Sequence, residues 1–211
     1  MAPPAKPARA GRKSYDEAYF TRWYRDARTR VSSPDAARRK IHMVAAVAEY
    51  FLGRKLRSVL DVGAGEGLWG VELRRLRPRL RYVGVDSSEY VVTHLGRERN
   101  IVRGSFESLP SLKVGGPFDL IVCADMLQYV PTPALRRGIR HLAQRLVGVA
   151  YLEAFTEADQ MEGDLEGWYP RTRSQYQRIF TGAGLVGCGM HCYLTAELAE
   201  NAVELELVER R

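Results

Sequence analysis

The sequence predicts an α/β fold: a doubly wound, mainly parallel seven-stranded sheet with helices on both faces. Three observations support this fold class. From about residue 54 onward, short apolar runs alternate with segments of helical period, which is typical of successive strand–helix units. Three glycines at 63–67 join the first apolar run to a helical segment, and an aspartate ends the second apolar run at position 86. The second and third observations also indicate where a ligand would bind.

The first residues predict a tail and two helices. Residues 1–13 are rich in proline, alanine and basic side chains without apolar periodicity, so we expect a disordered basic tail. At 14–53, large apolar residues recur three and four apart over 16–31, a break follows at 32–35, and a second helix runs to Leu52 before Gly53 ends it. The first helix is expected to form a lid. Residues 14–211 are predicted to be a single domain, with the sheet core at 54–211.

The core is expected to hold seven strands with helices between them. Residues 118–123 form a nearly unbroken apolar run, which is typical of a strand buried on both faces, and 202–208 alternate apolar residues with glutamates. The predicted strands are 58–62, 82–85, 101–103, 118–123, 147–152, 185–194 and 202–208. The predicted helices are 68–76, a segment through Val91 and Leu95, 132–146 and 173–181.

The composition is that of a globular protein. Of 211 residues, 45% are apolar and 27% charged, and no apolar run reaches the roughly 18 residues of a membrane-spanning helix. Three cysteines, an odd number at irregular spacing, argue against a disulfide framework, so a cytoplasmic location is expected. The formal net charge is +7. A basic cluster either contacts an anionic partner such as nucleic acid or is a solvated surface: Arg22, Arg25, Arg28, Arg30, Arg38, Arg39 and Lys40.

The turn at 61–67 reads Asp-Val-Gly-Ala-Gly-Glu-Gly. Glycine lets a ligand lie against bare backbone and adopts the positive φ values of a tight strand-to-helix turn. The same stretch also holds a dinucleotide-type pattern in Gly65, Gly67 and Gly70, whose role would be to bind pyrophosphate. Asp61 and Glu66 would repel pyrophosphate but would favour the cationic S-adenosylmethionine.

Asp86 ends the second predicted strand, 21 residues after Gly65. An acidic side chain at this place accepts from ribose hydroxyls, which indicates an adenosine-containing ligand. The structural alternative is that the segment 86–88 caps the next helix.

On these residues the chain resembles the class I, seven-stranded S-adenosylmethionine-dependent methyltransferases, from about residue 41 to 208. The motif at 59–67, the strand end at 83–86, the segment Gly-Ser-Phe-Glu-Ser-Leu-Pro at 104–110 and the strand at 118–127 match the family pattern. The resemblance implies a Rossmann-like core whose last strand is antiparallel, with S-adenosylmethionine as cofactor. It implies that Asp61 and Gly63 meet the methionine end of the donor, Asp86 the ribose, and Ser105 and Phe106 the adenine. The full set of expected cofactor-binding residues is Asp61, Gly63, Ala64, Gly65, Gly67, Asp86, Ser87, Ser105, Phe106 and Cys123.

Two departures from the family pattern bear on function. Many relatives have aspartate where Ser105 stands, so adenine recognition is expected to lean on Phe106. Relatives often carry histidine after the fourth strand, where this chain has Gln128 and Tyr129, so a histidine base is not expected there.

Methyl transfer from a sulfonium is an in-line displacement that needs alignment more than a catalytic group. The sequence therefore indicates only candidate residues for catalysis and for binding the methyl acceptor. The candidates for a catalytic role are Asp125, Tyr129, Glu153 and His191. Residues expected to line the acceptor site are Tyr19, Trp23, Tyr24, Gln128, Tyr129, Phe155 and Trp168.

The acceptor is expected to be a small molecule methylated on oxygen or nitrogen. The Asn-Pro-Pro-Tyr type of motif of nucleic-acid amino methylases is absent after the fourth strand, where 124–127 read Ala-Asp-Met-Leu. RNA or protein methylation, a nicotinamide-dependent oxidoreductase and a noncatalytic adenosine-binding module remain alternatives, and the oligomeric state stays open. Cys188, His191 and Cys192 supply three ligands on one predicted strand, one short of a structural zinc site, so no metal is expected.

Overall fold

The computed structural model describes residues 13–160 and 163–208. The predicted disordered tail lies outside the described residues, apart from Lys13. None of the helices in the described ranges is long and apolar enough to cross a membrane. The elements are α1 (Glu17–Phe20), η1 (Thr21–Arg25), α2 (Pro34–Leu52), β1 (Ser58–Val62), α3 (Leu68–Leu76), β2 (Arg81–Asp86), α4 (Glu89–Arg99), β3 (Ile101–Arg103), η2 (Leu109–Ser111), β4 (Phe118–Cys123), η3 (Leu127–Tyr129), α5 (Thr132–Ala143), β5 (Leu146–Leu152), α6 (Arg173–Thr181), β6 (Val186–Gly189), β7 (Cys192–Leu194), α7 (Ala196–Ala199) and η4 (Glu204–Glu206).

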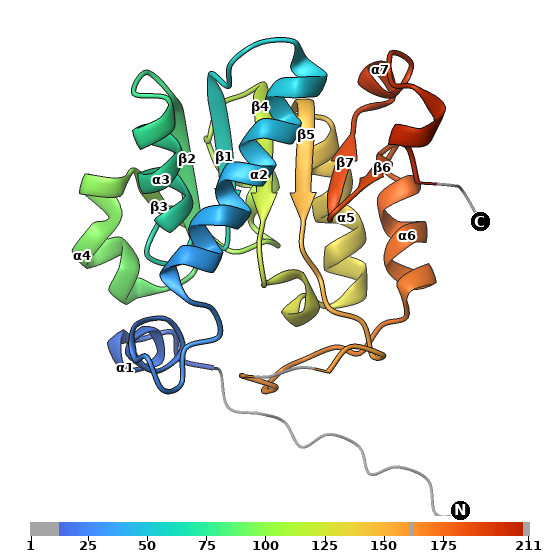
Figure 1. Cartoon of the computed structure of the whole chain (residues 1–211). Coiled ribbons are helices and arrows are strands. Elements are labelled where there is room, and N and C mark those ends of the chain that lie inside the picture. The colour runs from blue at the N-terminus through green and yellow to red at the C-terminus, as the bar shows by residue number, and fades with distance from the viewer. Residues whose placement is uncertain (1–12, 161–162, 209–211) are drawn as a thin grey trace, which may run out of the picture.

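The strands within the described residues form one seven-stranded sheet in the order β3-β2-β1-β4-β5-β7-β6. Strands β1 to β5 pair in parallel with their neighbours, whereas β7 runs antiparallel to both β5 and β6. Helices lie on both sides of the sheet (Figure 1). The predicted doubly wound, mainly parallel fold with an antiparallel last strand is confirmed.

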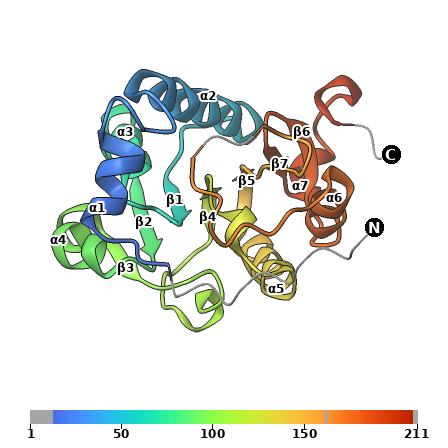
Figure 2. The same cartoon turned by 90° about the horizontal axis from the view of Figure 1, so that it is seen from below.

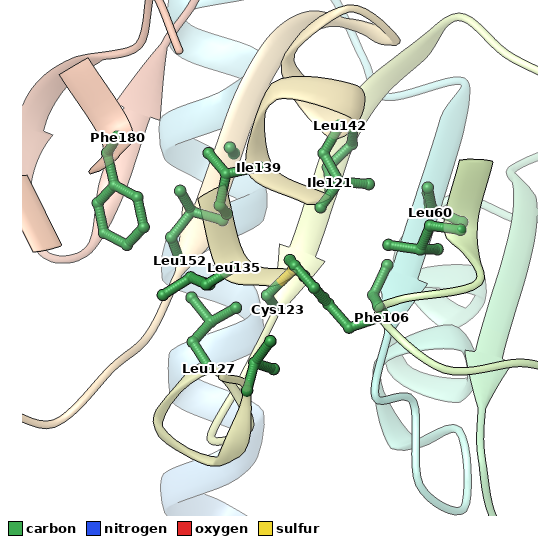
Figure 3. Packing of buried hydrophobic residues seen from close by; sticks show 14 of the residues in the cluster. Leu60, Phe106, Ile121, Cys123, Leu127, Leu135, Ile139, Leu142, Leu152 and Phe180 are labelled. Carbon is green, nitrogen blue, oxygen red and sulfur yellow. The ribbon is translucent and has the colours of Figure 1, made fainter. Parts of the chain in front are cut away.

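Two apolar layers sandwich the sheet. On one face, Ile41 and Val44 of α2 and Leu73 of α3 share a buried cluster with alternate residues of β1 and β4. On the other face, α5 and α6 cover β4 and β5 (Figure 3). All six residues of β4 are buried, as the apolar run at 118–123 predicts. This two-sided burial leaves only the strand ends free to form a site.

Local signals fix the ends of the second helix. The Ser33 hydroxyl accepts from the Ala36 N–H at 3.1 Å, and Pro34 fills the first helical position, where no N–H is needed. Gly53 ends α2 in the left-handed conformation with φ 62°. Both ends agree with the sequence prediction.

The predicted first helix is too long. Regular helix covers only Glu17–Phe20, a π-helical turn follows at Thr21–Arg25, and the chain is extended at Asp26. The Asp26 carboxylate accepts from the Arg28 N–H at 3.0 Å, a local bond that competes with helical continuation. The aromatic residues of the predicted first helix therefore lie in a short segment, Glu17–Arg25, which we call the lid segment.

The predicted last strand, 202–208, is wrong. Part of it forms the short helix η4, with Leu205 99% exposed and Val203 65% exposed, so its apolar alternation has no buried face to match. The final two strands come instead from the predicted strand 185–194. Positive φ values at Gly189, Met190 and His191 fold it into the β6–β7 hairpin.

The pairing of β4 with β5 contains an irregularity in register between Phe118 and Leu120. The intervening Asp119 carboxylate accepts from both terminal nitrogens of Arg54, at 2.7 and 2.9 Å, and from the Arg57 N–H at 2.6 Å. Burial would raise the pKa of Asp119, but the hydrogen bonds from Arg54 and the backbone lower it overall. Gly148 of β5 lies against the Asp119 carbonyl oxygen, which an added Cβ would approach to 2.1 Å.

Candidate functional site

A first cavity of about 240 Å³ lies at the carboxyl ends of β1, β2 and β4. Figure 2 looks onto this edge of the sheet and shows α1 beside the ends of β1 and β2. Strand ends form one part of the cavity wall and the lid segment the other. The lining includes six of the ten residues predicted to bind the cofactor: Gly63, Gly65, Asp86, Ser87, Ser105 and Phe106.

The glycine turn is left-handed at each of its three glycines, with φ 74° at Gly63, 50° at Gly65 and 78° at Gly67. A Cβ added to Gly63 would lie 2.8 Å from Cγ of Met126. The Gly63 N–H donates to the Val85 carbonyl at 2.8 Å, which ties the turn to β2. The backbone is thus held bare and close to the neighbouring strand, as a ligand lying on it requires.

Asp86 lies at the end of β2 and is nearly buried. Its carboxylate accepts from the Gly65 N–H at 2.7 Å and from the Ser88 N–H at 2.8 Å. Ser88, not Asp86, caps α4, because its hydroxyl accepts from the Val91 N–H. Burial raises the pKa of Asp86, partly offset by these backbone bonds. Each carboxylate oxygen keeps a further lone pair for a ligand hydroxyl.

The other four predicted cofactor residues do not line the cavity. Leu60 and Val62 point to the α5 face, so Asp61 points to the α2 and α3 face, where the Tyr82 hydroxyl donates to it at 2.7 Å. The expected contact of Asp61 with the methionine end is therefore not formed by a cavity-facing side chain. The remaining three pack elsewhere: Ala64 against Phe20 and Val91, Gly67 against Ile101, and Cys123 in the core.

Asp61 makes the stability of the protein depend on pH. Burial raises the pKa of Asp61 to about 7, while the Tyr82 hydrogen bond lowers it. A carboxyl whose pKa is higher in the folded state favours folding when protonated, so this contribution is lost as pH rises from about 4 to about 7. We expect Tyr82→Phe to reduce the free energy of unfolding by about 1 kcal/mol more at about pH 8 than at about pH 5. Urea titrations at both pH values test this.

Tyr169 is exposed, and its hydroxyl donates to no carboxylate within the described part of the chain, so it provides the matched control for this variant. Tyr169→Phe should change the free energy of unfolding equally at the two pH values. A pH-independent effect of Tyr82→Phe would mean that its hydroxyl does not stabilise ionised Asp61.

Glu66 does not contribute a free negative charge to the cavity. Its carboxylate forms an ion pair with Arg25, whose Nε donates to Oε2 at 3.3 Å. With Asp61 turned away as well, the expected repulsion of pyrophosphate by these two side chains is weaker than the sequence suggests. The choice of ligand must rest on other observations.

The far end of the cavity is formed after β3. Phe106 is buried, and its ring occupies the space beside Gly138 of α5, where an added Cβ would lie 2.0 Å from Cε1. Ser105 is engaged in its own turn, since its hydroxyl accepts from the Ser108 N–H at 3.3 Å. An aromatic ligand would therefore pack against the ring of Phe106 more than it would hydrogen-bond to Ser105.

Several lining residues escape prediction from sequence. Tyr15 and Phe20 belong to the aromatic lid segment and its approach, so helical spacing around Tyr19 was a signal for them. Others lie in strand-end segments that match the family pattern but were not predicted individually: Gly104, Glu107, Ala124 and Met126. Val130 and Pro131 had no local signal.

A second cavity, also of about 240 Å³, adjoins the first. Four residues line both cavities and form their common wall: Tyr19, Tyr24, Asp125 and Tyr129. The rest of its lining comes from the lid segment, the loop between η1 and α2, α2 itself and the segment after β5. Those residues are Trp23, Val31, Ser32, Lys40, Glu153, Phe155, Gln160 and Asp164.

Asp125 follows β4 with φ 53°, the left-handed region that aspartate adopts more readily than most residues. The Nε2 of Gln128 donates to its Oδ1 at 2.7 Å. Gln128 itself is fully buried and lines neither cavity, so it positions Asp125 and does not contact a ligand directly. Burial raises the pKa of Asp125 to about 6, against the lowering effect of Gln128.

Glu153 directly follows β5 and is 6% exposed. Lys40 of α2 donates to its Oε1 at 2.5 Å. Its Oε2 is buried without a hydrogen-bond partner among the described residues. A buried carboxylate oxygen without a donor is costly, which makes it a place for a ligand donor.

Residues 24–188 match the family model described as a methyltransferase domain. The match covers more than three quarters of the chain. The chain belongs to this methyltransferase family. No curated protein sequence matches it.

The methyltransferase also resembles solved structures. A sugar N-methyltransferase from Streptoalloteichus has 15% identity and a TM-score of 0.65, with 92% of this chain and 98% of that chain covered. The magnesium protoporphyrin IX methyltransferase of Synechocystis, with bound S-adenosylhomocysteine, has 18% identity, a TM-score of 0.56, and 86% and 96% coverage. A plantazolicin methyltransferase has 17% identity, a TM-score of 0.58, and 74% and 68% coverage. These likenesses support the fold, and S-adenosylmethionine is the methyl donor of the family.

Three residues predicted for the acceptor side of the methyltransferase line neither cavity: Gln128, Trp168 and His191. Trp168 lines neither, and its indole nitrogen is buried without a partner among the described residues. His191 lies in the β6–β7 turn, beside a groove along α6. Within residues 13–160 and 163–208, no group of three His, Cys, Asp or Glu side chains could hold a metal ion.

Proposed function

We propose that the methyltransferase binds S-adenosylmethionine in the first cavity and transfers its methyl group to an oxygen or nitrogen of a small acceptor in the second cavity. The observation that carries this proposal is the common wall. Four side chains line both cavities, so the two cavities adjoin at these residues, and the methyl group and the acceptor atom would meet there. In-line displacement needs the acceptor atom in contact with the methyl carbon and in line with the C–S bond.

On this proposal, the residues of the first cavity divide along the donor. Gly63 and Gly65 give the methionine end a bare backbone, which a side chain at Gly63 would fill. Asp86, with Ser87 beside it, accepts from the ribose hydroxyls. Phe106 packs against the adenine and Ser105 lies at its edge.

A small acceptor is favoured over a nucleic acid by the charges on the lid side. Four members of the basic cluster are paired with acids: Arg25 with Glu66, Arg28 with Asp26, Arg38 with Asp35, and Lys40 with Glu153. Paired charges attract phosphates less than free ones. The names of the neighbours point the same way, since they act on a sugar, magnesium protoporphyrin IX and plantazolicin.

Methyl-labelled donor tests the function directly. The full-length chain is incubated with labelled S-adenosylmethionine and an extract of the organism that encodes it, and the extract is then split by ultrafiltration. We expect label in the small-molecule fraction and no label in RNA or protein. Label confined to macromolecules would refute the small acceptor, and binding of NADH but not S-adenosylhomocysteine in calorimetry would refute the donor.

A variant that fills the second cavity tests whether the acceptor binds there. Ser32 lines the second cavity and not the first. Ser32→Trp should lower transfer at least about tenfold by excluding the acceptor, with S-adenosylhomocysteine affinity unchanged. Ser111→Trp makes the same change at an exposed site and should leave both unchanged.

A further inference from the structure

An alkylammonium group of the chain itself lies against the wall of the second cavity. The Lys13 ammonium is 4.2 Å from the ring centre of Tyr129 and 5.5 Å from those of Tyr15 and Tyr19. It also forms an ion pair with Asp164. Rings around an ammonium, with a carboxylate beside them, are the usual way in which proteins bind organic cations. Tyr19, Tyr129 and Asp164 all line the second cavity, so its walls already accept an ammonium at their rim.

The charges around the second cavity are not balanced. Its described lining has three carboxylates, Asp125, Glu153 and Asp164, and one ammonium, Lys40. Lys13 supplies a second positive charge from the rim. One negative charge is left over, which one cationic group of a ligand would neutralise.

Two carboxylates are placed to receive that cation. Glu153 is more than nine-tenths buried and lines the cavity, and its Oε2 accepts no hydrogen bond within 3.5 Å from the described residues. Tyr151 is its nearby titratable neighbour, and Glu153 helps to raise the pKa of the Tyr151 hydroxyl. Asp125 is the only carboxylate in the described lining that belongs to both cavities, so it lies where the methyl group would cross. An N–H donor on the acceptor would satisfy the first and reach the second.

We propose, resting on the function above, that the acceptor is a primary or secondary amine that enters the second cavity as an ammonium ion, and that Asp125 is the catalytic residue that removes its proton. Glu153 holds the ammonium through its Oε2. The deprotonated nitrogen attacks the methyl carbon with its lone pair, a C–N bond forms, and the C–S bond breaks with its electrons left on sulfur. The products are S-adenosylhomocysteine and an N-methylammonium, with one proton passed through Asp125 to solvent.

Selective blocking of amines tests the acceptor class. Aqueous acetylation of the small-molecule extract at neutral pH, followed by hydroxylamine to remove acetyl esters, converts amines into amides and leaves alcohols and phenols free. We expect transfer to fall at least about tenfold after this treatment, because an amide nitrogen has neither the charge nor the lone pair that the site uses. Transfer that persists on the acetylated extract would overturn the amine and leave the small-molecule function intact. Absence of label from the untreated small-molecule fraction would overturn both.

Variants separate the two carboxylates by role. Asp125→Asn should lower kcat about 100-fold with S-adenosylhomocysteine affinity held within a few-fold, and Glu153→Gln should mainly raise KM for the amine. Asp35→Asn, on the exposed first turn of α2, is the matched control and should change neither. A kcat unchanged by Asp125→Asn would overturn the assignment of the base.

The pH dependence of the activity separates a catalytic role of Asp125 from a purely structural one, because a structural residue would not change the pH profile. With an Asp125 pKa of about 6 in the ligand-free protein, kcat/KM of the wild type should rise as pH increases through about 6, and Asp125→Asn should lose that limb. A limb retained in the variant would contradict the assignment. The charged and titratable groups that face Asp125 are Lys13, Tyr24, Lys40, Tyr129, Tyr151 and Glu153, with Gln128 as its hydrogen-bond donor.

Discussion

Asp86→Ala is expected to weaken S-adenosylhomocysteine binding about 100-fold, or about 2.7 kcal/mol, because hydrogen bonds from ligand hydroxyls to a buried carboxylate are lost. The change also removes the acceptor for the Gly65 N–H, which Asp86 holds at 2.7 Å. The glycine turn thus loses part of its support together with the ligand contact. Isothermal calorimetry with the full-length chain measures the affinity.

Two variants make the Asp86 result specific. Asp86→Asn keeps the shape of the side chain and should recover only part of the lost affinity, since the carboxylate charge is missing. Glu89→Gln, three residues on and paired only with exposed Arg103, should bind as the wild type does. Unchanged affinity in Asp86→Ala would place the nucleoside outside the first cavity.

Gly148→Ala should lower the free energy of unfolding by about 3 kcal/mol, since overpacking here meets rigid backbone. An added Cβ would lie 2.1 Å from the Asp119 carbonyl oxygen and 3.0 Å from its carbonyl carbon, in the middle of the sheet. The irregular register of β4 and β5 brings the two strands together at this position. No side-chain rotation relieves a contact with backbone.

Urea denaturation provides the measurement for Gly148. Val147→Ala, at the exposed neighbouring position of the same strand, should cost less than about 1 kcal/mol and serves as control. Equal losses in the two variants would show that β5 tolerates a side chain at 148, and that the register irregularity does not require glycine.

The parts of the site that could be predicted from the sequence are those whose conformation depends on neighbouring residues in the chain. The glycines at 63–67 need positive φ, and Asp86 follows a strand next to them, so both signals lie within one strand–turn–helix unit. The direction of Asp61 was available from the same segment. A period of two places Asp61 with Val59, on the face opposite Leu60 and Val62.

The second cavity has no local signal because distant segments form it. Lys40 and Glu153 are 113 residues apart in sequence, and Lys13 meets Asp164 across a similar span. The strand predicted at 202–208 is absent for a related reason. A period of two indicates a strand only if a buried face is available to the apolar residues. Here the β6–β7 hairpin forms the edge of the sheet, so residues 202–208 have no such face.

The lid segment has a consequence for turnover. Tyr19 and Tyr24 close the two cavities together, and the segment is fastened at its ends by the Arg25–Glu66 ion pair and by the Ser88 hydroxyl, which donates to the Tyr15 carbonyl at 2.5 Å. A movement of the lid segment that breaks these two contacts would open both cavities together. On the function proposed above, S-adenosylhomocysteine and the methylated product would then be released through the same opening, in either order.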